Sequence, residues 1–215
     1  MGTLIKTIGR TCCIFFFLLV TLATAATQGE FAQQVLAETN LARTAPQRYA
    51  GYLRELRRQY RGKSYPMPGT DSLVMTSEGV TALDEAVRYL QKQAPLPPLA
   101  WSPGLAESAA DLVSDQGQNG EVGHTGSRSG DTRERIERYG TWLSRIAENI
   151  GYGPSTPRLM VMQLIIDDGV PGRGHRKNIF TRSFKVAGAT CGPHPQFRNM
   201  CAMEFAVGFR SGGGR

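Results

Sequence analysis

The spacing of apolar residues changes along this chain of 215 residues. Up to about residue 166 they recur every three or four positions, most clearly at residues 77–93, and this spacing predicts amphipathic helices. Residues 185–191 and 203–209 are instead predicted as two strands. In the second, the side chains of Cys201, Met203, Phe205, Val207 and Phe209 alternate with small or polar ones. Helices followed by an antiparallel hairpin are typical of an α+β domain in which the helices pack on a sheet.

Local signals at the ends of the predicted helices support their placement. Ser102 and Thr156 each stand before a proline, a combination typical of a helix start, and Thr44 is a candidate cap for a helix that begins near Pro46. The remaining elements are predicted as follows: helices at residues 31–43 and 131–139, loops at 62–71 and 117–130, a rigid connector at 95–99, and a strand or extended segment at 143–152.

The first 25 residues have the organisation of a secretory signal peptide. Lys6 and Arg10 form a basic start, residues 12–21 (CCIFFFLLVT) form a short apolar core, and Ala23 and Ala25 bracket an A-x-A cleavage motif. The apolar core is shorter than the roughly 20 residues that a spanning helix needs. We therefore expect cleavage between Ala25 and Ala26, a secreted product (extracellular or periplasmic), and no transmembrane segment in the mature chain.

Length and charge limit what the mature chain can be. After cleavage it is long enough for one ordinary domain, which we place at residues 26–211, with a flexible glycine-rich tail at 212–215. The net charge of +7 falls to +5 without the two cations of the signal peptide, a balance that favours anionic surfaces such as lipid headgroups or acidic wall polymers. Nucleic-acid binding is not predicted, because the sequence has no basic stripe interleaved with aromatic residues. The run RELRRQYR at residues 54–61 is interpreted as a solvated helix face.

Two cysteines, Cys191 and Cys201, remain after the predicted cleavage. In an oxidising compartment they are expected to form a disulfide, which would close the predicted hairpin and stabilise it by about 2–4 kcal/mol or less. The alternative is a pair of thiolates that bind a metal, which export makes the less favoured interpretation.

A small set of polar residues carries the chemistry that the sequence offers. His124 lies in the glycine-rich segment VGHTGSRSG, Glu148 in AENIGYG, and His175 in GHRKNIF, with Asp167 and Asp168 shortly before it. Two histidines and two carboxylates are nitrogen and oxygen ligands that Zn²⁺ accepts if the fold brings them together. The sequence contains no G-x-S-x-G, H-E-x-x-H or P-loop motif.

The order of these segments resembles a known family. NLAR, LPPLAW, GHTG, AENIGYG and GHRKNI are similar to motifs of the CAP superfamily, which includes cysteine-rich secretory proteins, antigen 5 and pathogenesis-related 1 proteins, and in particular to its bacterial SCP-like extracellular members. The resemblance covers about residues 31–210. It implies an α-β-α sandwich with a central antiparallel sheet flanked by helices, and a cleft lined by two histidines and two acidic residues.

The resemblance assigns the cleft residues one by one. His124 matches the first histidine, Glu148 the glutamate and His175 the second histidine of a predicted metal site. The second acid is a glutamate in many members, and here Asp167 or Asp168 lies in that position. We favour Asp167, because it shares a helical face with Gln163, whereas Asp168 borders a glycine and is expected to act as a cap or as a partner of Arg173. His194 is expected to be structural or exposed, and Asn40 and Arg43 are expected to have structural roles.

Three functions remain open from the sequence. The favoured one, implied by the resemblance, is a secreted, monomeric, non-enzymatic protein that holds a divalent metal, zinc being the candidate, and binds a lipid, a sterol, a cell-envelope component or a protein partner. The first alternative is a metal-dependent hydrolase with His124 and His175 as ligands and Glu148 or Asp167 as catalytic base. The second is a purely structural or interaction module in which the four residues only hold the fold.

Overall fold

The computed structural model describes residues 12–68 and 71–212, with side chains from residue 28 onward. The predicted basic start of the signal peptide, with Lys6 and Arg10, and most of the predicted tail lie outside these ranges. Within them, no helix is both long enough and apolar enough to span a membrane.

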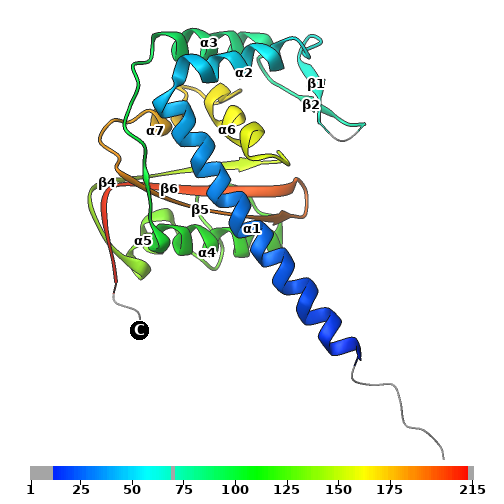
Figure 1. Ribbon diagram of the computed structural model, residues 1–215, viewed down its shortest axis with the longest axis vertical. Helices are drawn as coiled ribbons and strands as arrows, with labels where there is room; N and C mark the ends of the chain where they lie inside the picture. The colour runs from blue at the N-terminus through cyan, green and yellow to red at the C-terminus, as the bar shows by residue number, and fades with distance from the viewer. Residues whose placement is uncertain (1–11, 69–70, 213–215) are drawn as a thin grey trace, which may run out of the picture.

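A four-stranded sheet forms the centre of the protein (Figure 1). Its strands follow the order β3 (Ala100–Trp101), β5 (Val186–His194), β6 (Arg198–Ser211) and β4 (Gly140–Tyr152). All neighbours are antiparallel except the short β3, which runs parallel to β5. The predicted hairpin is therefore confirmed, and residues 143–152 belong to a strand that begins three residues earlier, at Gly140.

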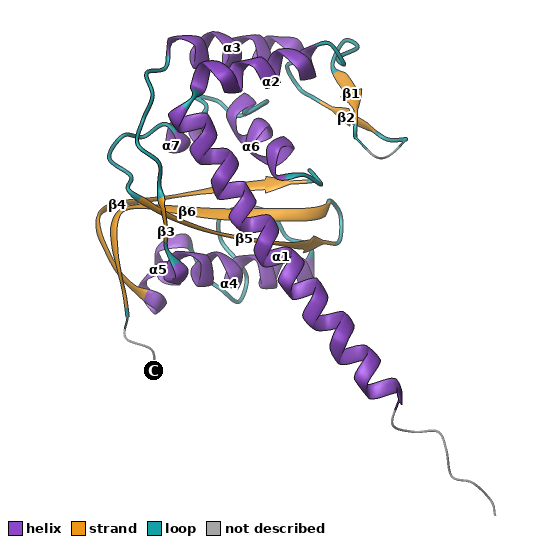
Figure 2. Cartoon of the chain, viewed as in Figure 1, coloured by secondary structure: helices purple, strands orange, loops and turns teal. Residues whose placement is uncertain are grey.

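Helices cover both faces of this sheet (Figures 1 and 2). On one face, α1 (Cys12–Thr44) packs on β5, whereas α6 (Pro157–Ile166) and α7 (Gly174–Ile179) pack on β4; α2 (Pro46–Arg57) and α3 (Val80–Lys92) lie outside them. On the other face, α4 (Pro103–Asn119) packs on β5 and β6, and α5 (Thr132–Tyr139) on β4. The α+β class and the α-β-α sandwich are thereby confirmed.

Strand β6 divides the interior into two cores because its side chains alternate between the two faces. Cys201, Met203 and Phe205 belong to the large core under α1, α2, α3 and α6, whereas Met200 and Ala202 belong to a smaller core under α4. Phe209 does not follow the predicted alternation and packs with Leu105 and Ile136 on the α4–α5 side. Beside it, β4 carries a bulge between Leu143 and Ile146, which changes the local twist of the strand pair.

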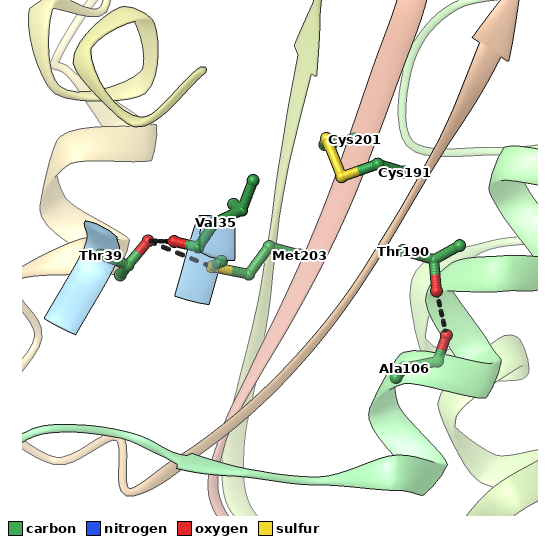
Figure 3. The surroundings of a disulfide bond; sticks show 7 residues. All are labelled: Val35, Thr39, Ala106, Thr190, Cys191, Cys201 and Met203. Carbon is green, nitrogen blue, oxygen red and sulfur yellow. Dashed lines mark hydrogen bonds between the residues drawn. A yellow bond between two sulfur atoms is a disulfide. The ribbon is translucent and has the colours of Figure 1, made fainter. Parts of the chain in front are cut away.

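The predicted disulfide joins β5 to β6 (Figure 3). Cys191 and Cys201 are direct partners in the strand register, and their Cα atoms are 4.1 Å apart. The neighbouring Thr190 points to the opposite face, where its hydroxyl donates to the carbonyl of Ala106 in α4 at 2.7 Å. This end of the hairpin is therefore attached to both helical layers.

The helix-start signals are confirmed in two of three cases. The hydroxyls of Ser102 and Thr156 accept the backbone N–H groups of Leu105 and Leu159. The cap predicted at Thr44 is wrong, because Thr44 is still the last residue of α1 and its hydroxyl donates to the carbonyl of Asn40. Helix α2 follows after a single residue that provides no side-chain cap.

Two segments differ from their predicted boundaries. The region predicted as a loop at 62–71 contains β1 (Ser64–Pro66), which pairs with β2 (Leu73–Met75) in a small hairpin; such short strands leave no period in the sequence. Helix α1 extends N-terminally to Cys12, so the predicted cleavage point between Ala25 and Ala26 lies within it. This first part of α1 projects away from the body of the protein (Figure 1).

Candidate histidine–carboxylate site

The four predicted site residues lie together as two pairs. Nδ1 of His124 is 2.8 Å from Oε1 of Glu148, and Nδ1 of His175 is 2.7 Å from Oδ1 of Asp167. The centroids of the two histidine rings are 6.4 Å apart. His124 comes from the loop after α4, Glu148 from β4, Asp167 from the end of α6 and His175 from α7, so residues separated by up to 51 positions meet at one edge of the sheet.

The structure distinguishes between the two candidate aspartates. Asp167 ends α6 in a left-handed conformation, with φ of 58°, and its carboxylate also accepts the backbone N–H groups of His175 and Arg176. Asp168 turns away and accepts the N–H groups of Ser77 and Glu78. Asp168 therefore holds the turn before α3, whose N-cap Gly79 has no side-chain cap. Neither expected role, helix cap or partner of Arg173, is observed, because Arg173 pairs with Glu78 and Glu85.

Burial separates the carboxylates from the histidines. The side chains of Glu148 and Asp167 are 2% and 1% exposed, whereas those of His124 and His175 are 55% and 22% exposed. A carboxylate at Nδ1 favours the tautomer that carries its proton there and leaves the lone pair of Nε2 free. The arrangement matches the way a buried carboxylate orients a histidine for a ligand on the other ring nitrogen.

Arg135 of α5 is a component of the site that the sequence interpretation missed. Its guanidinium is fully buried; Nη2 donates to Oε2 of Glu148 at 2.5 Å, and Nη1 donates to the carbonyls of His124 and Gly130. The hydroxyl of Thr132 donates to the other oxygen of Glu148 at 2.8 Å. The pattern of residues 131–139 predicts a short charged helix, and nothing in it distinguishes a buried arginine from a solvated one.

The motifs around Glu148 and His175 are joined by two asparagines. Nδ2 of Asn149 donates to the carbonyl of His175 at 3.0 Å, and Nδ2 of Asn178 donates to Oδ1 of Asn149 at 2.9 Å. Asn178 also contacts the carbonyl of Glu148. The asparagines of AENI and GHRKNI therefore attach α7 to β4 and set the position of the second histidine.

The loop that carries His124 is held by Tyr152 and Gln116. The Tyr152 hydroxyl accepts the N–H of Gly123 and donates to Oε1 of Gln116, whose Nε2 donates to the carbonyl of Gly123. His194 is buried nearby, with Nε2 3.0 Å from the carbonyl of Glu121, so its expected structural role is confirmed. Asn40 and Arg43 are likewise structural: Asn40 bonds both backbone groups of Leu99, and Arg43 donates to three carbonyls.

Glu204 lies behind the site, directly opposite Glu148 in the register of β4 and β6. Its Oε1 accepts from the Ser108 hydroxyl at 2.9 Å, Nε of Arg135 is 3.8 Å away, and its Oε2 has no hydrogen-bond partner among the described residues. Burial raises the pKa of Glu204 well above its usual range, and the charge of Glu148 adds to this shift. Glu204 therefore retains its proton at pH values where an exposed glutamate is ionised.

The free energy of unfolding of the wild type is expected to fall as pH rises, because of Glu204. The substitution Glu204→Gln should abolish this fall. The folded state keeps the proton while the unfolded state loses it above its pKa of about 4.5, so the free energy of unfolding falls with pH until the raised folded pKa is passed. The measurement is the urea midpoint from mildly acidic to mildly alkaline pH. Glutamine should flatten this profile.

Glu137→Gln is the matched control for the Glu204 experiment. Bonds from Arg133 and Trp142 lower the pKa of Glu137, so this carboxylate contributes stability that is lost as pH falls, the opposite sign. A Glu204→Gln profile that runs parallel to the wild type above pH 5 would show that Glu204 is ionised in the folded protein.

A groove lies beside His175, between the β1–β2 hairpin and the end of β4. It has a volume of about 190 Å³. Its walls are mostly aromatic and aliphatic: Tyr60, Tyr65, Val74, Met75, Ile150, Tyr152, Leu164, Ile166 and Val170, with Gln163, Asp167, Asp168 and His175 among its polar groups. Among the described residues, no three or more histidine, cysteine, aspartate or glutamate side chains are grouped so as to hold a metal ion.

Fold and site together are those of an α-β-α sandwich with a histidine–carboxylate cluster at the edge of its sheet. The sequence model described as "Cysteine-rich secretory protein family" matches residues 36–207. The chain belongs to this family, also called CAP.

Several solved structures are similar to the chain. Three of them are an extracellular protein containing a SCP domain from Bacillus anthracis (18% identity, TM-score 0.44, 63% of this chain and 46% of that one), an outer surface protein from Borrelia burgdorferi (17%, 0.43, 52% and 78%), and a cysteine-rich secretory protein from Staphylococcus aureus (15%, 0.39, 60% and 38%). The chain thus spans less than half of the first and third of these proteins. No curated protein matches the chain.

Proposed function

We propose that this CAP protein is exported and binds a divalent metal ion, zinc in the first instance, through Nε2 of His124 and of His175, with a ligand held in the adjacent groove. The observation that carries the proposal is the pairing of each Nδ1 with a buried carboxylate, at 2.8 Å and 2.7 Å. Such second partners orient the ring and raise the basicity of the nitrogen that binds the metal.

The two rings are close enough to share an ion after a small movement. With zinc–nitrogen bonds of about 2.1 Å and tetrahedral angles, two histidines on one ion have ring centroids roughly 5.3 Å apart. The observed value is 6.4 Å, so the exposed ring of His124 would have to rotate toward His175 when the ion binds. Two histidines provide only two of the four usual ligands, and no third histidine, cysteine, aspartate or glutamate of the described chain is grouped with them to hold an ion. Water or the bound ligand would complete the coordination, and the ion would supply Lewis acidity.

Binding is favoured over hydrolysis by the state of the carboxylates. Glu148 receives bonds from His124, Thr132 and Arg135, and Asp167 from His175 and Arg176. Carboxylates engaged in this way orient the histidines and are poorly placed to take a proton from water. The apolar walls of the groove support a ligand with an apolar part, such as a lipid, a sterol or a cell-envelope component.

The test is the metal content of purified protein, measured by elemental mass spectrometry after zinc is supplied and excess is removed. We expect about one zinc per chain at neutral pH, and its loss in the His124→Ala/His175→Ala variant. Binding should also weaken at mildly acidic pH, because protons compete for the Nε2 lone pairs. Glu148→Gln should reduce zinc affinity about 10- to 100-fold while leaving both histidines in place.

Glu137→Gln is the control, because it removes an exposed carboxylate outside the two pairs and should retain the metal. Wild-type protein that remains free of zinc, cobalt and manganese would refute the metal site. A loss of stability in His124→Ala without any metal binding would support the structural-module alternative.

A further inference from the structure

The positive charge of the chain is concentrated in one segment. Residues 46–75, which form α2 and the β1–β2 hairpin, contain six lysine or arginine side chains and two acidic ones, Glu55 and Asp71. Their excess of four accounts for most of the net +5 that residues 26–215 carry. A surface built from this segment differs in charge from the rest of the protein.

The arginines of α2 point to solvent. The helix buries Tyr49, Leu53 and Leu56 against the large core, so Arg54 and Arg58 lie on its outer face, and Arg61 follows in the turn. All three are exposed and have no acidic partner among the described residues. Arg57, at the side of the helix, is the one paired with Asp84 of α3.

The β1–β2 hairpin, which follows Arg61 in the chain, presents exposed apolar side chains. Its strands pair Ser64 with Met75 and Pro66 with Leu73. Side chains alternate along a strand, so Tyr65 and Val74 face the groove, whereas Leu73 and Met75 lie on the opposite, outer face. Met75 lies at the rim and also borders the groove. Leu73 and Met75 are 59% and 73% exposed, among the most exposed large apolar residues of the described chain.

Backbone contacts hold the two features together. Arg61 forms a bridge with Ser64, and the N–H of Thr76 donates to the carbonyl of Lys63 at 2.8 Å. The hairpin consequently extends from the end of α2, as Figure 1 shows at the cyan part of the chain. We call the surface formed by Arg54, Arg58, Arg61, Leu73 and Met75 the basic–apolar corner.

We propose that the basic–apolar corner docks the protein onto an anionic lipid bilayer. Arginines near such a surface are attracted to its headgroups, each by about fivefold in affinity, and neighbouring apolar side chains gain by entering the interface. A soluble acidic polymer would satisfy the arginines but leave Leu73 and Met75 in water. The apolar half of the corner is therefore what selects a bilayer.

The test measures sedimentation of residues 26–215, which contain all the core residues among the described side chains, with lipid vesicles. We expect binding to vesicles of equal parts phosphatidylglycerol and phosphatidylcholine and little binding to pure phosphatidylcholine. Arg54→Gln/Arg58→Gln/Arg61→Gln should reduce the affinity at least about tenfold. The control, Arg182→Gln/Arg198→Gln/Arg210→Gln, removes the same charge from exposed positions elsewhere and should reduce it much less.

The apolar contribution is tested by Leu73→Ser, because Leu73 is not among the residues that line the groove, whereas Met75 is. This variant should bind more weakly at low salt and lose its remaining binding at high salt, because only screened charge contacts remain. The proposal is overturned if both arginine triples weaken binding equally, if the serine variant binds as the wild type does, or if soluble polyphosphate binds as tightly as the vesicles. All variants alter exposed side chains, and unchanged thermal unfolding would verify that they fold.

Discussion

Replacing Arg135 by methionine is expected to destabilise the protein by about 3–5 kcal/mol, the usual cost of removing one partner of a buried ion pair. Arg135 is fully buried, bonds Oε2 of Glu148, and holds the carbonyls of His124 and Gly130. Without it, Glu148 is left as a buried carboxylate beside Glu204. The measurement is urea unfolding at neutral pH, where the midpoint should fall with little change in slope.

A second substitution distinguishes the charge effect from a packing effect. In Arg135→Met/Glu148→Gln the residue left without its partner is a neutral glutamine. The double variant should therefore be more stable than the summed losses of Arg135→Met and Glu148→Gln predict. Arg133→Met is the control: Arg133 is 68% exposed and pairs with Glu137 on the surface, where such pairs contribute about 0–1 kcal/mol. Equal losses in Arg135→Met and Arg133→Met would contradict the buried-pair interpretation.

Gly188→Ala is expected to cost about 3 kcal/mol or more, at the upper end of the range for overpacking. A Cβ at Gly188 of β5 would lie 2.5 Å from the carbonyl carbon of Leu105 and 2.6 Å from the carbonyl oxygen of Ser102, and closer still to the nitrogen of Ala106. These atoms belong to the backbone at the start of α4, which cannot rotate away as a side chain can. Helix and strand must therefore separate.

The loss at Gly188 is measured by thermal unfolding, or by the yield of refolding from urea if the variant does not accumulate. Gly51→Ala provides the matched control, because nothing lies within 4 Å of a Cβ at that helical position. Alanine there should stabilise the protein by about 0.5–1 kcal/mol. If Gly188→Ala unfolds at the wild-type temperature, the close approach of α4 to β5 is not as the structure has it.

Much of the fold was predictable because it depends on local periodicity. The helix at residues 80–92 and the paired strands near Cys191 and Cys201 follow from spacings of three to four and of two. The β1–β2 hairpin and the end of α1 at Thr44 were not predicted. Three-residue strands are too short to show a period, and the hydroxyl of Thr44 bonds equally well within its own helix.

The residues of the candidate site were predictable from the resemblance, but the way they pair was not. The motifs around His124, Glu148 and His175 indicated histidines and acids, and a helical face favoured Asp167. The pairing of each Nδ1 with a carboxylate depends on the end of α6, where Asp167 adopts φ of 58° and so directs its side chain to α7. No sequence pattern specifies a single residue in that conformation when it is not glycine.

The amino-acid sequence by itself determined the class of fold, the disulfide partners and the residues available for a metal, because each follows from local spacing or from residue chemistry. Only the tertiary structure decided that Arg135 pairs with Glu148, that Glu204 lies opposite Glu148 in the sheet, and that Leu73 and Met75 are exposed on the hairpin that follows α2. All three depend on which faces of separate elements meet. That choice is made by packing across the whole domain, and it leaves no trace in the pattern of any one segment.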